Sequence, residues 1–131
     1  MAAEISDARP FVYALLRVVP CVERGEQINV GVTLFCRQHD FLELKIGLDR
    51  HRLAAMAPDA DADAIASRLE EIRRVVEGDP SAGSLARLDP SDLFGWLVAP
   101  SSTVIQASQA HTGLTSDPAA ELDRLFRSLV L

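Results

Sequence analysis

Two long apolar runs separated by a short charged segment constrain the fold more than any other feature of this sequence. The first run, Phe11 to Val19, and the second, Ile28 to Cys36, are rich in the β-branched and aromatic residues that pack well on a pleated sheet. The segment between them, Pro20 to Gln27, holds a proline, a glycine and three charged residues, which interrupt strand pairing and favour a solvated turn. The sequence therefore predicts an antiparallel hairpin of two strands.

The second run alternates between two kinds of side chain, as a strand with two different faces would. One face carries apolar residues and is expected to form the core: Ile28, Val30, Val32, Leu34 and Cys36. The other face carries Asn29, Gly31 and Thr33, a surface that can lie under a helix, a partner backbone or a ligand. Because a glycine inside a strand commonly marks the close approach of other backbone, we expect a helix packed over Gly31, with a ligand surface as the alternative.

The rest of the chain alternates between strand-like and helix-like patterns. The expected elements are a third strand over Phe41 to Gly47, a short helix from Asp49 to about Met56, a longer helix from the Asp59 to Asp63 run up to Gly78, a helix from Asp89 to Pro100, a fourth strand over Thr103 to Ser108, an exit turn at Ala110 to Gly113, and a terminal helix opened by Asp117 and Pro118. Together they predict an α+β fold, with an antiparallel meander of three strands, a later fourth strand, and two or three covering helices. We expect a single domain over residues 1–131, with residues 1–9 disordered.

The charge of the chain narrows the classes of partner. Nineteen acidic residues against thirteen basic ones give a net charge of -6, which disfavours binding to nucleic acid or to an anionic membrane. No apolar run approaches the roughly 20 residues of a membrane span, and the first residues do not resemble a secretion signal, so we expect a cytoplasmic protein. Cys36 should lie opposite Phe11 or Val12 and far from Cys21, so we expect packing cysteines and no disulfide.

Two polar clusters remain once the core is assigned. Arg24, Glu26 and Asn29 surround the first turn, and a second set surrounds the fourth strand: Ser101, Ser102, Thr103, Gln106, His111 and Thr112. Such groups can recognise phosphate or carboxylate, and a histidine can exchange a proton near neutral pH. The competing interpretation is structural: an exposed ion pair in the turn worth at most about 1 kcal/mol, and side chains that cap nearby backbone.

The sequence lacks several motifs that identify an enzyme class. It has no P-loop, GxGxxG, GxSxG, HExxH or CxxC pattern, and we expect neither a cofactor nor a metal ion. The acidic run Asp59 to Asp63 lacks the glycine and distal glutamate of a calcium loop, so we interpret it as a helix cap. Trp96 is interpreted as a core or interface residue rather than a platform for a nucleobase.

Three segments resemble a known bacterial family. RVVPCVERGEQINVGVTLFC, WLVAPSSTVIQ and HTGLTSDPAAELDRLF are similar to the domain of unknown function 3037 and together span most of the chain. The resemblance points to Arg24, Gly25, Glu26, Asn29 and Gly31 in the hairpin, and to Gln106, His111, Thr112 and Gly113 later in the chain. Gly95 and Ser101 depart from the family pattern, in which arginines are expected, and their loss would weaken an anion site there.

Members of this family are often encoded beside HipA-like kinases, which implies a protein partner rather than a particular chemistry. We therefore expect a small binding or accessory module that partners such a kinase, with Arg24, Glu26, Asn29, Ser101, Gln106, His111 and Thr112 as the candidate contact residues. The alternative is a small enzyme or sensor for an anionic small molecule, in which Arg24 and Glu26 position the ligand and His111 acts as acid or base, Glu26 being the second candidate catalytic group.

Overall fold

A five-stranded antiparallel sheet forms the centre of the molecule. The computed structural model describes residues 7–100 and 103–131. Strands β1 (Arg9–Val18), β2 (Ile28–Cys36) and β3 (Phe41–Ile46) form the expected meander, and β4 (Ile105–Ala107) and β5 (His111–Thr115) both pair with the free edge of β1. The prediction of an α+β fold is confirmed, and so is the addition of a later fourth strand. Of the N-terminal residues expected to be disordered, 1–6 lie outside the described part of the chain.

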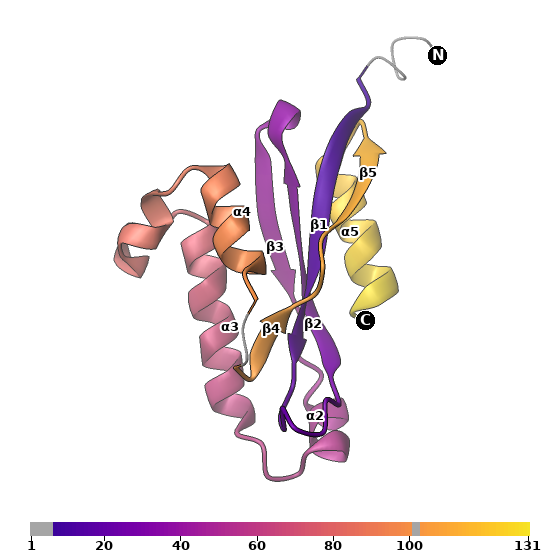
Figure 1. Cartoon of the computed structure of the whole chain (residues 1–131), viewed down its shortest axis with the longest axis vertical. Coiled ribbons are helices and arrows are strands. Elements are labelled where there is room, and N and C mark those ends of the chain that lie inside the picture. Colours follow the sequence, from indigo (N-terminus) through magenta and orange to yellow (C-terminus); the bar gives the residue numbers. More distant parts are fainter. Residues whose placement is uncertain (1–6, 101–102) are drawn as a thin grey trace.

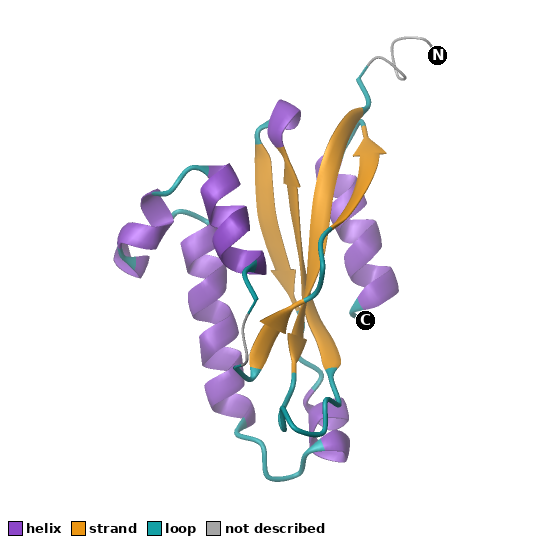
Figure 2. Cartoon of the chain, viewed as in Figure 1, coloured by secondary structure: helices purple, strands orange, loops and turns teal. Residues whose placement is uncertain are grey.

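Helices cover both faces of this sheet (Figure 1, Figure 2). Helix α3 (Ala62–Val76) and helix α4 (Pro90–Val98) lie on one face, where Leu69 and Leu97 join a core with Leu16. Helix α5 (Pro118–Leu129) covers the other face, where Leu122 and Leu125 join a second core. The short helix α2 (Arg50–Met56) follows β3, and 3-10 turns lie at Arg37–His39, Pro80–Ala82 and Ser84–Arg87.

The helices begin where the aspartates of the sequence predict. Asp61 caps α3 by accepting a hydrogen bond from the backbone N–H of Ala64 at 3.0 Å, and Asp63 pairs with Arg50 at 2.7 Å. Asp49, Asp89 and Asp117 cap α2, α4 and α5 in the same way. An aspartate side chain suits this position because it satisfies a first-turn N–H that has no partner within the helix. The interpretation of the acidic run as a helix cap is therefore confirmed.

Of the β2 residues expected to form the core, Val30, Val32, Leu34 and Cys36 are buried, but the expectation that they share one face is wrong. The register passes from Leu16 opposite Gly31 to Arg17 opposite Asn29, so Val30 is an extra residue that forms a β-bulge. Because the bulge reverses the alternation, Val30 packs in the core beneath α3, whereas Val32 packs in the core beneath α5. The atoms nearest to a Cβ built on Gly31 belong to β3 and β1, not to a helix: the Lys45 carbonyl oxygen would be 3.0 Å away.

The predicted exit turn at Ala110 to Gly113 is also wrong, because β5 begins at His111. The glycine signalled a turn, but Gly113 lies opposite Phe11 in the ladder, and a Cβ built on Gly113 would be 2.7 Å from Cζ of the Phe11 ring. The glycine therefore makes room for an aromatic ring from the neighbouring strand, a known use of glycine at a sheet edge. Between β4 and β5, buried Ser108 keeps the edge attached, since its Oγ accepts a hydrogen bond from the Leu15 N–H at 2.9 Å.

Candidate binding groove

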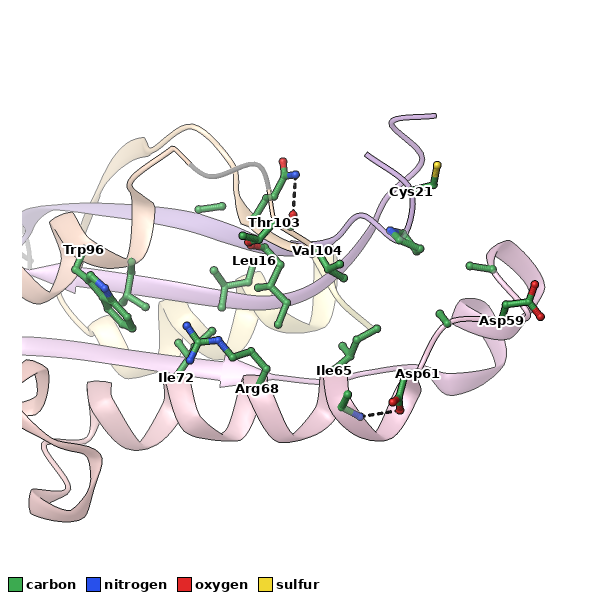
Figure 3. A pocket seen from close by; sticks show the side chains of 18 residues that line it. Leu16, Cys21, Asp59, Asp61, Ile65, Arg68, Ile72, Trp96, Thr103 and Val104 are labelled. Carbon is green, nitrogen blue, oxygen red and sulfur yellow. Dashed lines mark hydrogen bonds between the residues drawn. The ribbon is translucent and has the colours of Figure 1, made fainter. Parts of the chain in front are cut away.

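An apolar groove runs between α3 and β4 on the face of the sheet that α3 and α4 share. Its volume is about 790 Å³, and it extends from Trp96 at one end to Cys21 and Asp59 at the other (Figure 3). The apolar lining includes Leu16, Ile65, Ile72 and Leu97. These four residues also belong to the hydrophobic core between α3 and the sheet. We call this feature the α3–β4 groove.

The sequence of α3 and the turn before it explains why space remains there. Helix α3 packs on β3, away from the edge that β4 forms. The residues that α3 and this turn present to the groove include Ala60 and Ala64, whose small side chains leave the neighbouring sheet surface open. Bulkier residues at these two positions would reach toward β4 and narrow the gap. The groove thus occupies the place beside α3 where another helix would normally cover a sheet.

Polar side chains are a minority of the groove lining, and Cys21, Asp59 and Asp61 lie at one end of it (Figure 3). Asp61 is committed to capping α3, and Arg68 donates a hydrogen bond to Glu71 at 3.0 Å. The exposed Asp59 side chain makes no hydrogen bond or ion pair among the residues that the structure describes. The end of the groove beside Cys21 therefore presents a negative charge that is not neutralised by a neighbour.

A smaller hollow of about 340 Å³ adjoins this end of the groove. The two share Pro20, Cys21, Ala57 and Asp59, and the smaller one is also lined by Arg24 and Glu26. Nε of Arg24 lies 2.6 Å from Oε1 of Glu26. This hydrogen bond, together with the charge of the guanidinium, holds the pKa of Glu26 below its ordinary value. The pair thus occupies the outer wall of the hollow as a compact and already neutralised unit.

The structure divides the residues that the sequence nominated. Arg24 and Glu26 line the smaller hollow, and Gln106 lines the α3–β4 groove, where its Nε2 donates a hydrogen bond to the Thr103 carbonyl at 2.9 Å. These three residues therefore line two adjoining hollows, Arg24 and Glu26 the smaller one and Gln106 the larger one. Ser101 and Ser102 lie outside the described residues.

His111 and Thr112 lie elsewhere, on β5. In the ladder His111 is opposite Tyr13, and their ring centroids are 5.3 Å apart. Tyr13 precedes the end of β1 at Val18 by five residues, so roughly 17 Å of strand separates it from the turn that holds Arg24. Neither His111 nor Thr112 lines the groove or the smaller hollow.

Asn29 has a place in the framework instead. Its Nδ2 donates a hydrogen bond to the Leu129 carbonyl at 3.0 Å, and its Oδ1 accepts one from Nε of Arg17 at 3.3 Å. The side chain thus joins the first hairpin to the last turn of α5. The Leu129 carbonyl is one of the helix-terminal acceptors that lack an intrahelical donor, which is why an amide is useful there.

Sequence reasoning missed part of the groove lining. Cys21 was expected to be a packing residue, but it is exposed at the start of the turn and lines the groove, whereas Cys36 is buried; both are free thiols. A signal was present in the spacing of Ala60, Ala64 and Arg68, which lie four residues apart and therefore share one side of the helix and its entry turn. Two small residues in this row indicate a place where the helix surface is not filled.

Most of the chain resembles a known protein family. Residues 13–130 match a family described as a protein of unknown function (DUF3037). Neither the comparison with curated proteins nor the comparison with solved structures gave a match. No helix of the described residues is long and apolar enough to cross a membrane. Because the match covers nearly the whole sequence, including most of β1, all of β2, the groove and α5, the chain belongs to the DUF3037 family.

Proposed function

We propose that this domain is a binding module that receives an amphipathic segment of a protein partner in the α3–β4 groove. The observation that carries the proposal is the groove itself, an open apolar depression of about 790 Å³ on the sheet surface beside α3. Removing this apolar surface from water lowers the free energy, so a partner that covers the groove gains binding free energy. An amphipathic helix laid beside α3 would complete the helical layer, as in other complexes in which a helix binds a groove.

The charges at the groove favour a partner segment with a basic residue at one end. The Asp59 carboxylate forms no ion pair with any residue that the structure describes, and the whole chain carries a net charge of -6. A Lys or Arg of the partner placed beside Asp59 would gain from both the local pair and the overall field, which also speeds encounter. An anionic partner would instead meet Asp59 at one end and an Arg68 that is already paired with Glu71.

The family resemblance supplies the candidate partner, a HipA-like kinase in the cytoplasm. Co-expression of the chain with the neighbouring kinase should give a complex that elutes as one species in size-exclusion chromatography. Separate elution of the two proteins at micromolar concentrations would contradict this choice of partner.

Substitutions in the groove test whether the groove is the contact surface. Ala64→Glu places a charge and extra bulk on an exposed wall residue of α3, and we expect the affinity for the kinase to fall by at least about tenfold. Ala119→Glu makes the same change on an exposed alanine of α5, on the opposite face of the sheet, and should leave the affinity unchanged. Equal affinities for the two variants, measured by isothermal titration calorimetry, would place the contact outside the groove.

Charge reversal tests the orientation of the partner. Asp59→Lys should weaken binding by about fivefold, corresponding to ~1 kcal/mol, and the loss should shrink at high salt. Asp7→Lys changes the net charge equally but lies beyond the far end of β1, so it should have a smaller effect. If Asp7→Lys weakens binding as much as Asp59→Lys does, the effect comes from net charge and not from a contact with Asp59.

A second candidate function is a sensor or small enzyme for an anionic small molecule. The location of Arg24 and Glu26 in the wall of the smaller hollow supports it, because an incoming anion could exchange with Glu26 for the guanidinium. The roughly 17 Å of strand between the level of His111 and this turn argues against a shared reaction centre. If the domain is a sensor, Arg24→Ala should abolish binding of inorganic phosphate. If it is an enzyme, Arg24→Ala and His111→Ala should both abolish ligand binding or turnover while leaving the melting temperature unchanged.

A further inference from the structure

The two edges of the sheet differ in how they are protected. Strand β3 forms one edge, and β4 followed by β5 forms the other, since both pair with β1. Within residues 7–100 and 103–131, β5 pairs with β1 alone, so its outer side offers backbone N–H and C=O groups to another strand. Unpaired edges of this kind are templates for strand addition.

Charge protects the β3 edge but not the β5 edge. Strand β3 carries Glu43 and Lys45, and Nζ of Lys45 lies 2.9 Å from Oδ1 of Asp123 on α5. Charged side chains on an edge strand oppose the approach of another strand. In contrast, no Asp, Glu, Lys or Arg occurs anywhere between Val104 and Ser116, in a chain of which 24% of residues are charged.

An exposed apolar side chain lies on the same unprotected strand. Leu114 is 69% exposed, and it shares one side of β5 with Thr112, which is also exposed. Gly113 between them lies beneath the Phe11 ring on the opposite side, and the pairing of β5 with β1 continues without a break from His111 to Thr115. The strand is therefore regular, lacks Asp, Glu, Lys and Arg, and is exposed at His111, Thr112 and Leu114.

We infer that β5 is the contact through which two copies of this chain associate, by antiparallel pairing of one β5 with the other. A two-fold axis at Gly113 would set Thr112 opposite Leu114 of the second copy, and His111 opposite Thr115. Each exposed Leu114 would then pack beside Thr112 of the other copy, and the two sheets would form one continuous sheet. The inference is independent of the proposed function, because the α3–β4 groove lies at the other end of β1.

Electrostatics favours a second copy at this edge over other parts of the surface. Two chains that each carry a net charge of -6 repel one another, and the repulsion is weakest where neither contributes a charged side chain to the contact. The remaining long-range repulsion is screened by salt. Association should therefore strengthen as the ionic strength rises, which is the opposite of what an interface held by ion pairs would do.

Sedimentation equilibrium of the full chain tests the inference. Between about 5 µM and about 500 µM the wild type should pass from monomer to dimer, with a lower dissociation constant at about 0.5 M salt than at about 0.05 M. Leu114→Lys should weaken the dimer by at least about tenfold, because it places two ammonium groups near the axis. Leu131→Lys is the matched control: Leu131 is 70% exposed but lies at the chain end, and its substitution should leave the dimer unchanged.

The register can be tested separately by disulfide cross-linking in a Cys21→Ser background. Mixing a Thr112→Cys variant with a Leu114→Cys variant should give a covalent dimer on mild oxidation, because directly opposed residues meet disulfide geometry. Either variant alone should react poorly, since like positions would be diagonal neighbours.

A wild type that stays monomeric throughout, including in the presence of high salt, would overturn the inference. A dimer that Leu114→Lys and Leu131→Lys affect equally would also overturn it, because the contact between the two copies would then lie outside β5.

Discussion

At the scale of single residues, Asn29 has a structural role where the sequence predicted a binding role. The family resemblance and the position in the hairpin nominated it as a contact residue, whereas its side chain bridges Arg17 and the Leu129 carbonyl. An amide can do this because it offers a donor and an acceptor at once. The neighbouring Arg24 and Glu26 pair with each other instead and remain at the surface.

We expect Asn29→Ala to lower the free energy of unfolding by about 1–2 kcal/mol, because a partly buried carbonyl and a guanidinium each lose a partner. Urea denaturation of the variant measures this loss. Gln27→Ala removes an exposed amide from the same hairpin and should change the stability by less than about 0.5 kcal/mol. If Asn29→Ala is as stable as the wild type and yet no longer binds the kinase, Asn29 is a contact residue and the structural interpretation fails.

At the scale of elements, one charged contact connects β3 to α5. Lys45 on β3 donates a hydrogen bond to Asp123 on α5, and Arg127 of α5 lies 2.8 Å from the same carboxylate. The hydrogen bond from Lys45, with the positive charges of Arg127 and Lys45, holds the pKa of Asp123 below its ordinary value; partial desolvation opposes the shift. The contact joins the β3 edge to the helix that covers the second face of the sheet.

The lowered pKa of Asp123 makes this contact sensitive to acid. Because the folded protein holds the carboxylate in its charged form more strongly than the unfolded chain does, the contribution to stability is present above the unfolded pKa of about 4 and is lost as the pH falls through the folded value. We expect the melting temperature of the wild type to fall on acidification through this range. The fall should be shallower in Asp123→Asn, which retains a hydrogen-bonding amide but has no titrating group. An Asp123→Asn variant with the same pH dependence as the wild type would show that other carboxyl groups account for acid sensitivity.

The elements also show which signals in the sequence are reliable. The Asp-Pro pairs located the starts of α4 and α5, and apolar spacing located α3, because capping and amphipathic periodicity are local properties. The bulge at Val30 and strand β5 were not predicted. Both depend on pairing partners far away in the sequence: Leu16 and Arg17 define the bulge, and Phe11 explains Gly113. A glycine read by itself indicates a turn, and only the opposite strand shows that it accommodates a ring.

At the scale of the whole molecule, the groove arises from how the layers are arranged rather than from any motif. The apolar hairpin predicted the centre of the sheet, but not that α3 would settle over β3 and leave the surface near β4 open. The same arrangement explains why the nominated polar residues separate: Arg24, Glu26 and Gln106 line adjoining hollows near the end of β1, while His111 and Thr112 pair with its earlier half. Composition alone carries no information about that division.

The single tryptophan of the chain offers the most direct test of the binding proposal. Trp96 closes one end of the α3–β4 groove, so its indole N–H gives one assignable signal in a ¹H–¹⁵N correlation spectrum. On titration with the HipA-like kinase, the indole signal and the backbone signals of Ala64 and Gln106 should shift or broaden together, and those of Ala119 and Ala120 on α5 should stay in place. A complex that forms while the Trp96, Ala64 and Gln106 signals remain unchanged would contradict the claim that the groove receives the partner.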